Sequence, residues 1–185
     1  MLTKQVLAII GDSGAGKTSL SKELVRLNNY PLLACRDLGN ALAMGKYNCH
    51  SFEECLDLPN SDQYIDDLNK KIVSCVLNKF RRMDGNILIF DDLILIDAVR
   101  MLQAKGVDVK IYLLNTPYEI RIKRIMEREC CTYQDAVSEE QKKVLTKKRL
   151  GINDVKKIKY YKLDGAKPID KILEVFSSSI RVIEH

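Results

Sequence analysis

A glycine-rich segment close to the N-terminus constrains the fold more than any other feature of the chain. It reads Gly11-Asp12-Ser13-Gly14-Ala15-Gly16-Lys17-Thr18 and fits the pattern G-x-x-x-x-G-K-[ST] in full. An apolar run over residues 5–10 precedes it, and residues 17–28 after it carry leucines at helical spacing. A buried strand, a glycine loop and a helix in this order predict a phosphate-binding turn, because backbone N–H groups converge at the helix N-terminus.

The chemistry of this loop predicts a nucleoside triphosphate with Mg²⁺, and we expect ATP. Lys17 is placed to reach the β- and γ-phosphates, and the Thr18 hydroxyl is placed to bind the metal. The residues expected to bind the nucleotide are Gly11, Asp12, Ser13, Gly14, Ala15, Gly16, Lys17, Thr18 and Ser19. A glycine-rich turn without a ligand is the plainer alternative, against which the full pattern and its context both argue.

Apolar runs and helical spacings alternate along the 185 residues of the chain. Strands are expected at residues 5–10, 32–35, 86–90, 109–114 and 159–163. Helices are expected at residues 17–28, 52–58, and at about 61–83, 93–105, 117–129, 132–149 and 168–180. A further short helix is expected to begin after Asp37, which would be its N-cap. This alternation predicts an α/β fold with a parallel, doubly wound sheet, helices on both faces, and one domain over residues 1–185.

Two carboxylates, Asp91 and Asp92, directly follow the third expected strand. Ligands of parallel sheets gather at the carboxyl ends of the strands. We therefore expect Asp91 to bind the metal together with Thr18 and to take part in catalysis. Asp92, whose side chain should point in another direction, is expected on the acceptor side. In the plainer interpretation, one of the two carboxylates caps the helix that follows.

Three arginines, Arg121, Arg124 and Arg128, lie at i, i+3 and i+7 and form a row on the helix expected at 117–129. A guanidinium stabilises the negative charge that spreads over a γ-phosphoryl group during transfer. Arg124 and Arg128 are therefore expected to be catalytic, with Lys17 and Asp91. The charged stretch that follows suits a lid, placed at about 129–149, although a solvated helix face explains it equally well.

Arg36 and Asp37 directly follow the second expected strand. Arg36 could hold an acceptor phosphate through two hydrogen bonds, and Asp37 could bind a sugar hydroxyl. We expect the acceptor-binding helical region at about 36–83. A surface arginine that pairs with a nearby acid is the alternative.

Composition excludes several classes of partner. The 30 Lys and Arg residues against 25 Asp and Glu residues give a net charge of +5, which favours anionic ligands but does not argue for nucleic acid. No apolar run approaches the ~18 residues of a membrane span. We expect a small-molecule acceptor as partner, no nucleic acid, no membrane, and a monomer or homodimer.

The 6 cysteines include no CxxC pair, and we expect reduced thiols in a cytoplasmic protein. The adjacent Cys130 and Cys131 are redox-sensitive or, more simply, two small residues at a helix end.

The chain resembles nucleoside monophosphate kinases, and most of all the short archaeal-type cytidylate kinases. The resemblance lies in IIGDSGAGKTSLSKEL, LGNALAMGKYNCHSFEECLDLPNSDQYIDDLNKKI, ILIF before Asp91, and KIYLLNTPYEIRIKRIMEREC, followed by CTYQDAV. Its more telling part is T-P-x-E-x-R-x-x-R-x-x-x-R, from Thr116 to Arg128. The resemblance implies a three-layer P-loop NTPase fold with strand order 2-3-1-4-5, a lid near 129–149, and Arg124 and Arg128 in phosphoryl transfer. It also places Asn40 and Asp92 at acceptor-side positions where the family carries arginine.

Three functions follow as hypotheses. The first is an ATP-dependent kinase whose acceptor is a nucleoside monophosphate such as CMP, dCMP, UMP or AMP. The second is a related kinase with another small acceptor, for example dephospho-coenzyme A. The third is a nucleotide-binding regulator of a protein partner, and the absence of an N-K-x-D segment argues against a GTPase of this kind.

Overall fold

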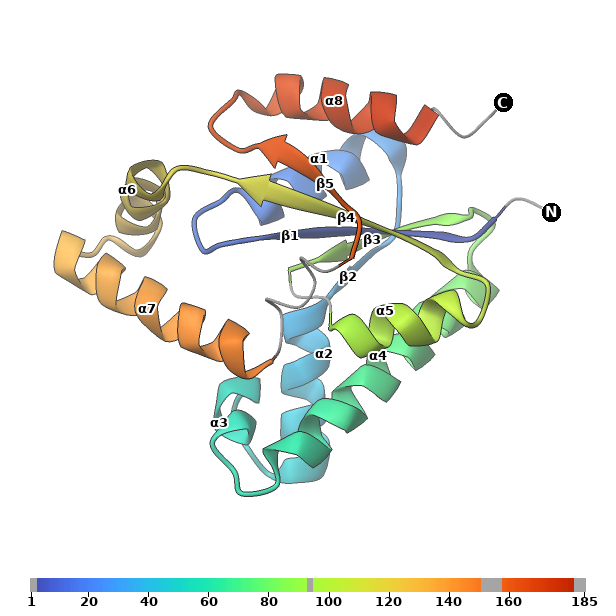
Figure 1. Ribbon diagram of the computed structural model, residues 1–185, viewed down its shortest axis with the longest axis horizontal. Coiled ribbons are helices and arrows are strands. Elements are labelled where there is room, and N and C mark those ends of the chain that lie inside the picture. Colours follow the sequence, from blue (N-terminus) through green and yellow to red (C-terminus); the bar gives the residue numbers. More distant parts are fainter. Residues whose placement is uncertain (1–2, 93–94, 151–157, 182–185) are drawn as a thin grey trace.

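The computed structural model of the chain describes residues 3–92, 95–150 and 158–181. Its centre is a sheet of five parallel strands, β1 (Gln5–Gly11), β2 (Leu32–Ala34), β3 (Ile87–Asp91), β4 (Asp108–Asn115) and β5 (Tyr160–Asp164). The strands lie in the order β2-β3-β1-β4-β5, which confirms the expected order (Figure 1). In this register Ile9 of β1 lies beside Asp91 of β3, so the glycine loop and the paired carboxylates meet at one edge of the sheet.

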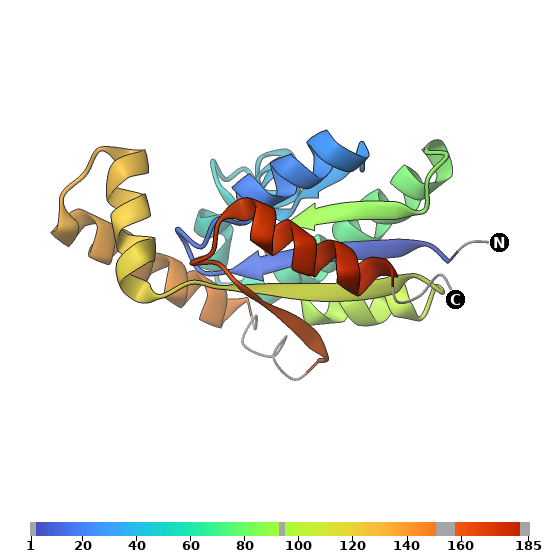
Figure 2. The ribbon, with the colours of Figure 1, turned by 90° about the horizontal axis from the view of Figure 1, so that it is seen from above.

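Helices cover both faces of the sheet, as Figures 1 and 2 show. One face carries α1 (Lys17–Asn28) and α8 (Ile169–Arg181), and the other carries α4 (Ser61–Arg82) and α5 (Ile96–Gln103). Alternate residues of β1 enter two different cores: Val6 and Ala8 pack on the side of α4 and α5, and Leu7 and Ile9 on the side of α1 and α8. Burial on both faces explains why residues 5–10 are apolar at almost every position.

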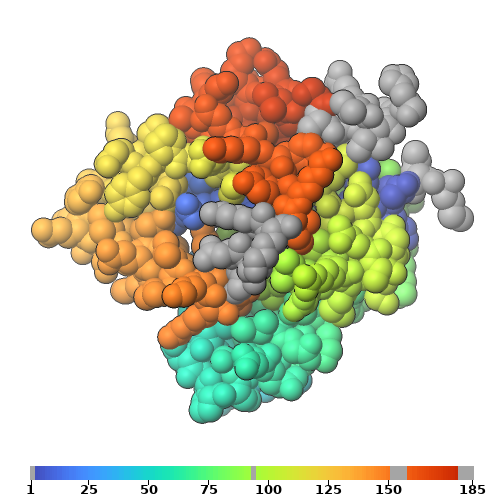
Figure 3. All heavy atoms as spheres, viewed as in Figure 1, coloured from blue at the N-terminus to red at the C-terminus, as the bar shows by residue number. Residues whose placement is uncertain are grey.

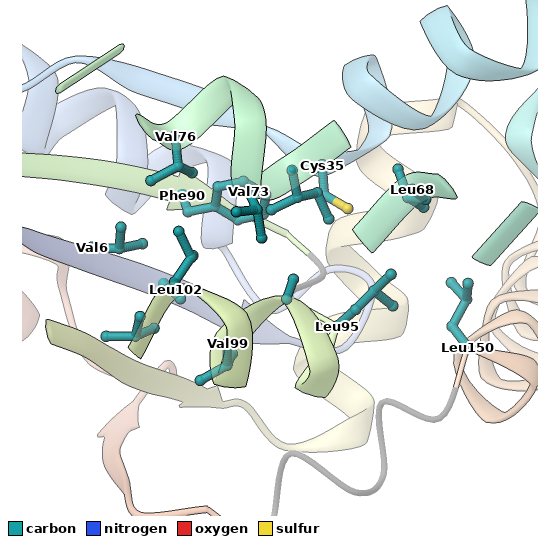
Figure 4. Close-up of a cluster of buried hydrophobic side chains, with 14 of the residues drawn as sticks. Val6, Cys35, Leu68, Val73, Val76, Phe90, Leu95, Val99, Leu102 and Leu150 are labelled. Carbon is teal, nitrogen blue, oxygen red and sulfur yellow. The ribbon is translucent and has the colours of Figure 1, made fainter. Parts of the chain in front are cut away.

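The core between the sheet, α4 and α5 is the larger of the two. Figure 4 shows Val76 of α4, Phe90 of β3 and Leu102 of α5 close together within it. Within the described residues, no helix combines the length and the apolar character needed to cross a membrane.

Two helices, α6 (Tyr118–Glu129) and α7 (Tyr133–Arg149), stand away from the sheet as an arm (Figure 2). Thr132 begins α7 with a capping box, in which its Oγ1 accepts from Asp135 N and its own N–H donates to the Asp135 carboxylate. Ile122, Ile125 and Ala136 form a small core that holds the two helices together. The arm therefore has its own apolar contact and is not a solvated helix alone.

The C-terminal end of α7 packs against the helices on the α4 and α5 side of the sheet. Leu150 is buried in the core that contains α4 and α5, and Arg149 pairs with Asp57 just after α3 (Phe52–Leu56). In Figure 3 the orange atoms of α7 lie against the teal atoms of the α3 region. The helix thus passes over the edge where the glycine loop lies.

The segment after β2 differs from the expectation. Helix α2 (Cys35–Leu42) begins directly after the strand with Ala34 as its N-cap, so the prediction of Asp37 as N-cap was wrong and Asp37 lies in the first turn. An immediate start lets the Cys35 side chain enter the core. A π-helical turn, η1 (Ala43–Tyr47), follows and was not predicted. The helix start expected at residue 93 lies outside the described residues.

Candidate active site

The glycine loop joins β1 to α1 and leaves the start of α1 open to an anion. Gly14 and Gly16 have φ of +73° and +102°, which only glycine adopts without strain. A Cβ on Gly14 would lie 2.4 Å from the carbonyl oxygen of Arg121. Among the described residues no side chain caps helix α1, and its first turn has no acidic residue, so its first N–H groups and its dipole are available to a phosphate.

Lys17 lies between the loop and the end of β3. Its Nζ donates to the Asp12 carbonyl oxygen at 3.1 Å and is 3.4 Å from Oδ1 of Asp92. Burial lowers the pKa of Lys17, and the Asp92 carboxylate opposes this shift. The ammonium is thus held at the mouth of the loop by one carbonyl and one carboxylate.

Asp91 is buried, with 6% of its surface exposed, and its Oδ1 has no hydrogen-bond partner among the described residues. Burial raises the pKa of Asp91, while the hydroxyls of Ser21 and Thr18 act in the opposite direction through hydrogen bonds. An unpartnered carboxylate oxygen near the Thr18 hydroxyl fits Mg²⁺, which takes oxygen ligands and keeps waters or phosphate oxygens on its other positions. No cluster of three or more His, Cys, Asp or Glu able to hold a metal occurs among the residues described, so the phosphates of a nucleotide would have to complete this site.

Asp92 adopts φ of +76°, an uncommon backbone conformation for a residue with a side chain. Its N–H donates to the carbonyl oxygen of Ile9 at 3.1 Å, which fixes the turn at the end of β3. The N-cap of α5 is Leu95, and the side chain that caps its first turn is Asn69 of α4, whose Oδ1 accepts from the Ala98 N–H at 2.9 Å. The alternative in which Asp91 or Asp92 caps the next helix is therefore not what the structure shows.

The three arginines of α6 have different environments. Arg124 donates from Nη1 to the carbonyl oxygens of Gly14 and Ala15 at 3.4 and 3.2 Å, so it lies against the glycine loop. Arg128 is exposed and pairs with Glu129 at 2.8 Å. Arg121 is buried, where it pairs with Glu140 of α7 and donates to the carbonyl oxygen of Ser13 at 3.3 Å. The row expected from the spacing therefore divides into one buried cation and two that face the cleft.

Two functional contacts of α7 were not predicted from the sequence. Glu140 was counted with the charged arm, but only 4% of its surface is exposed. Lys147 donates from Nζ to the Gly11 carbonyl oxygen and to Oδ1 of Asp12, both at 2.9 Å. Burial raises the pKa of Asp12, but Lys147 and Arg121 outweigh it, and the pKa lies below its ordinary value. Glu140 and Lys147 are seven residues apart and share a helix face, but their exposed neighbours carry the same charges, so no local signal in the sequence singles them out.

On the other side of the cleft, α2 provides two of the expected acceptor residues, and α3 adds two residues that were not predicted. Arg36 and Asp37 line the cleft, together with Phe52 and Glu53. Asn40 is not among its lining residues, because its Oδ1 accepts a hydrogen bond from the Phe52 N–H at 3.0 Å and ties α2 to α3. The structure therefore brings Arg36 and Asp37 to the site and gives Asn40 a role in the fold of this region.

These residues enclose one cleft of ≈ 960 Å³ at the carboxyl edge of the sheet. Of the nine residues expected to bind the nucleotide, six line this cleft: Ser13, Gly14, Gly16, Lys17, Thr18 and Ser19. The other three, Gly11, Asp12 and Ala15, are not among its lining residues. Asp91 and Asp92 line it from β3, Arg124 and Arg128 from α6, and Lys147 from α7. Loop, carboxylates and cations thus face a single space that is large enough for a nucleotide and part of a second small molecule.

Comparison with known proteins supports the architecture. A family model described as AAA domain matches residues 7–145, and no curated protein matches the chain. The structure is similar to that of TT1252 from Thermus thermophilus, with 13% identity, a TM-score of 0.64 and 100% of both chains covered.

The structure is also similar to the solved structures of two kinases. A sugar kinase from a Janibacter species has 14% identity and a TM-score of 0.63, with 98% of this chain and 96% of that chain covered. Deoxyadenosine kinase from M. mycoides, solved with dCMP and dCDP, has 14% identity and a TM-score of 0.53, with 96% of this chain and 100% of that chain covered. At these identities the likeness shows a common fold, that of the P-loop kinases.

Proposed function

The chain belongs to the AAA domain family, whose model covers residues 7–145, and we propose that it is an ATP-dependent phosphotransferase with a small acceptor. The observation that carries this proposal is the position of Lys17. Its Nζ lies 3.4 Å from the Asp92 carboxylate, beside the start of α1, whose first N–H groups are capped by no side chain of the described residues. Donor phosphates and an acceptor oxygen can therefore meet at this point of the cleft.

Each group at the site has a distinct role in this proposal. The N–H groups at the start of α1 and Lys17 hold the β- and γ-phosphates. Thr18 and Asp91 would hold Mg²⁺, which when bound would offset the negative charge of the phosphates. Arg124 and Arg128 stabilise the charge that develops on the transferred group.

The transfer itself is a substitution at phosphorus. An acceptor oxygen forms a bond to the γ-phosphorus while the bond from that phosphorus to the β–γ bridging oxygen breaks, and ADP leaves with the electron pair. An ionised phosphate oxygen has no proton to lose, whereas a hydroxyl must give its proton to a base. The protein contributes position and charge, and α7 covers the loop so that water does not compete as acceptor.

We place the acceptor between α2, α3 and the end of β3, within the region of residues 36–83, and the lid at about 129–149. The sequence resemblance implies a nucleoside monophosphate, and Arg36 is the cation of this wall that could bind one. Another small acceptor, such as dephospho-coenzyme A, is the second candidate, because Asp92 gives the end of β3 a negative charge.

The direct test is ADP release from Mg·ATP by the full chain and by Lys17→Ala, with a panel of small acceptors. We expect Lys17→Ala to lose turnover and keep its melting temperature within a few degrees, because the ammonium serves the phosphates and not the core. Lys123→Ala, which removes a lysine exposed on α6, is the matched control and should behave as wild type. Near-normal turnover by Lys17→Ala would refute the assignment, and ATP binding without any acceptor would favour the regulator.

A further inference from the structure

The two walls of the cleft carry opposite charge. The donor wall, from the glycine loop, α1, α6 and α7, is lined by Lys17, Lys22, Arg124, Arg128, Lys143 and Lys147, with Glu129 as its one carboxylate among the described residues. The acceptor wall, from α2, α3 and the end of β3, is lined by one cation, Arg36, and by the carboxylates of Asp37, Glu53, Asp91 and Asp92. An acceptor therefore meets more negative than positive charge on its own side.

The carboxylates of Asp37 and Glu53 are free to bind a ligand. Within the described part of the chain, neither has a hydrogen bond or an ion pair, although both line the cleft. Asp37 lies in the first turn of α2, where its charge already meets the positive end of the helix dipole. That helix end is therefore not available as a second site for an anion.

Among the described residues, Arg36 is the only cation that lines the acceptor wall, and its guanidinium also interacts with other groups of the protein. Its guanidinium lies 6.0 Å from the centre of the Phe52 ring. It also lines a neighbouring hollow of ≈ 490 Å³ with Glu129, Asp135 and Glu139. A hydrogen bond from Lys143 lowers the pKa of Glu139, and the charge of Arg36 contributes in the same direction. Part of the attraction that Arg36 could offer a phosphate is thus offset by carboxylates.

A phosphate monoester brings close to two negative charges at neutral pH, and unpaired carboxylates nearby repel it. Hydroxyl groups, in contrast, donate hydrogen bonds to carboxylates and gain from them. We propose that the acceptor is an uncharged polyhydroxy compound, a sugar or a nucleoside, whose hydroxyls donate to Asp37 and Glu53. This inference rests on the proposed phosphotransferase function and names the acceptor class of the same site.

The chemistry of an alcohol acceptor balances with the groups present. The hydroxyl oxygen bonds to the γ-phosphorus, its proton passes to an oxygen of the transferred phosphoryl group, and the bond to the bridging oxygen breaks to release ADP with the electron pair. Lys17, 3.4 Å from the Asp92 carboxylate, contacts the donor phosphates in this account. Asp91, buried with an unpartnered Oδ1, lines the same cleft and remains the metal ligand.

The test uses acceptor pairs that differ only by one phosphate: cytidine and CMP, deoxyadenosine and dAMP, glucose and glucose 6-phosphate. ADP release from Mg·ATP should give kcat/KM at least about tenfold higher for the unphosphorylated member of any pair that is turned over. A higher kcat/KM for the phosphorylated member overturns this inference and leaves the phosphotransferase standing. Failure of the protein to bind Mg·ATP instead refutes the proposed function.

If no acceptor pair is turned over, a variant with altered charge on the acceptor wall tests the proposal. With a non-hydrolysable ATP analogue and Mg²⁺ saturating the loop, CMP binding is measured for wild type and for the double variant Asp37→Asn, Glu53→Gln. We expect the double variant to bind CMP at least about tenfold more tightly, because two repelling charges are removed. The control Asp62→Asn, Asp170→Asn removes two charges in the first turns of α4 and α8, away from the cleft, and should not change CMP binding. Equal CMP affinity in wild type and double variant overturns the proposal.

Discussion

Arg121 on α6 and Glu140 on α7 form an ion pair that is buried beneath the glycine loop. The same guanidinium donates from Nη1 to the carbonyl oxygen of Ser13 and from Nε to that of Thr116. One side chain therefore links the two helices of the arm, the loop and the end of β4. The pair sets the position of the arm over the cleft, although neither residue lines it.

Removal of Glu140 tests this link. Glu140→Ala leaves the buried Arg121 charge with the more distant, half-exposed Asp12 carboxylate, 3.8 Å away, as counter-ion, which should cost up to about 3–5 kcal/mol in the free energy of unfolding. Urea unfolding of the ligand-free protein measures this cost. Glu127→Ala, which removes an exposed carboxylate of α6, is the control and should change stability by less than about 0.5 kcal/mol. Equal stability of the two variants would show that the pair does not hold the arm.

Gly14→Ala should impair nucleotide binding through the backbone. A side chain at this position needs φ near +73° and places its Cβ 2.4 Å from the Arg121 carbonyl oxygen, so loop and α6 must move apart. We expect ATP affinity to fall at least about tenfold, because the converging N–H groups lose their geometry. The added Cβ of Gly45→Ala meets no atom of the described residues within 4 Å, so this variant should bind ATP as wild type. Unchanged affinity in Gly14→Ala would contradict the described loop.

The buried carboxyl of Asp91 predicts a pH dependence of stability. Burial raises its pKa above the ordinary 3.8, so the folded state binds more protons than the unfolded state at pH values just above 3.8. Its favourable contribution is complete below the unfolded pKa and is lost as pH rises through the raised folded value. Asp91→Asn should remove this loss and make the melting temperature of the ligand-free protein fall less between about pH 4 and about pH 7.

The same variant, Asp91→Asn, should lose activity although its stability at neutral pH is improved. Asp91→Asn should lose Mg²⁺-dependent turnover, because the carboxylate is the proposed metal ligand. Asp84→Asn, at an exposed turn, controls for the change of net charge. If the melting temperatures of wild type and Asp91→Asn change with pH in the same way, this would contradict the rise in the pKa of Asp91 that burial is expected to cause.

The features that the sequence predicts correctly are those determined by local patterns. The apolar run of β1 reveals a strand buried on both faces, and the glycine spacing reveals the turn from β1 to α1. Asp91 follows an apolar run, so its place at the carboxyl edge of a parallel sheet could be derived. Each of these patterns requires only neighbours in the chain.

The remaining features depend on contacts between distant segments. Glu140 and Lys147 carry the same kind of charge as their exposed neighbours, and only the packing of α7 over the loop distinguishes them. Asn40 was expected on the acceptor side, but its amide oxygen accepts a hydrogen bond from the Phe52 N–H, twelve residues away. The start of α2 at Cys35 depends on the core that the cysteine enters. No spacing in the chain encodes these partners.

The most direct test of the central claim is a calorimetric titration of the full, folded chain with ATP, with and without Mg²⁺. The account predicts saturable binding at one site per chain, with a Kd of about 1–100 µM in the presence of Mg²⁺. It also predicts affinity at least about tenfold weaker for Lys17→Ala. A folded protein that takes up no ATP under these conditions would contradict the assignment of the glycine loop as a nucleotide site, and with it the proposed phosphotransferase.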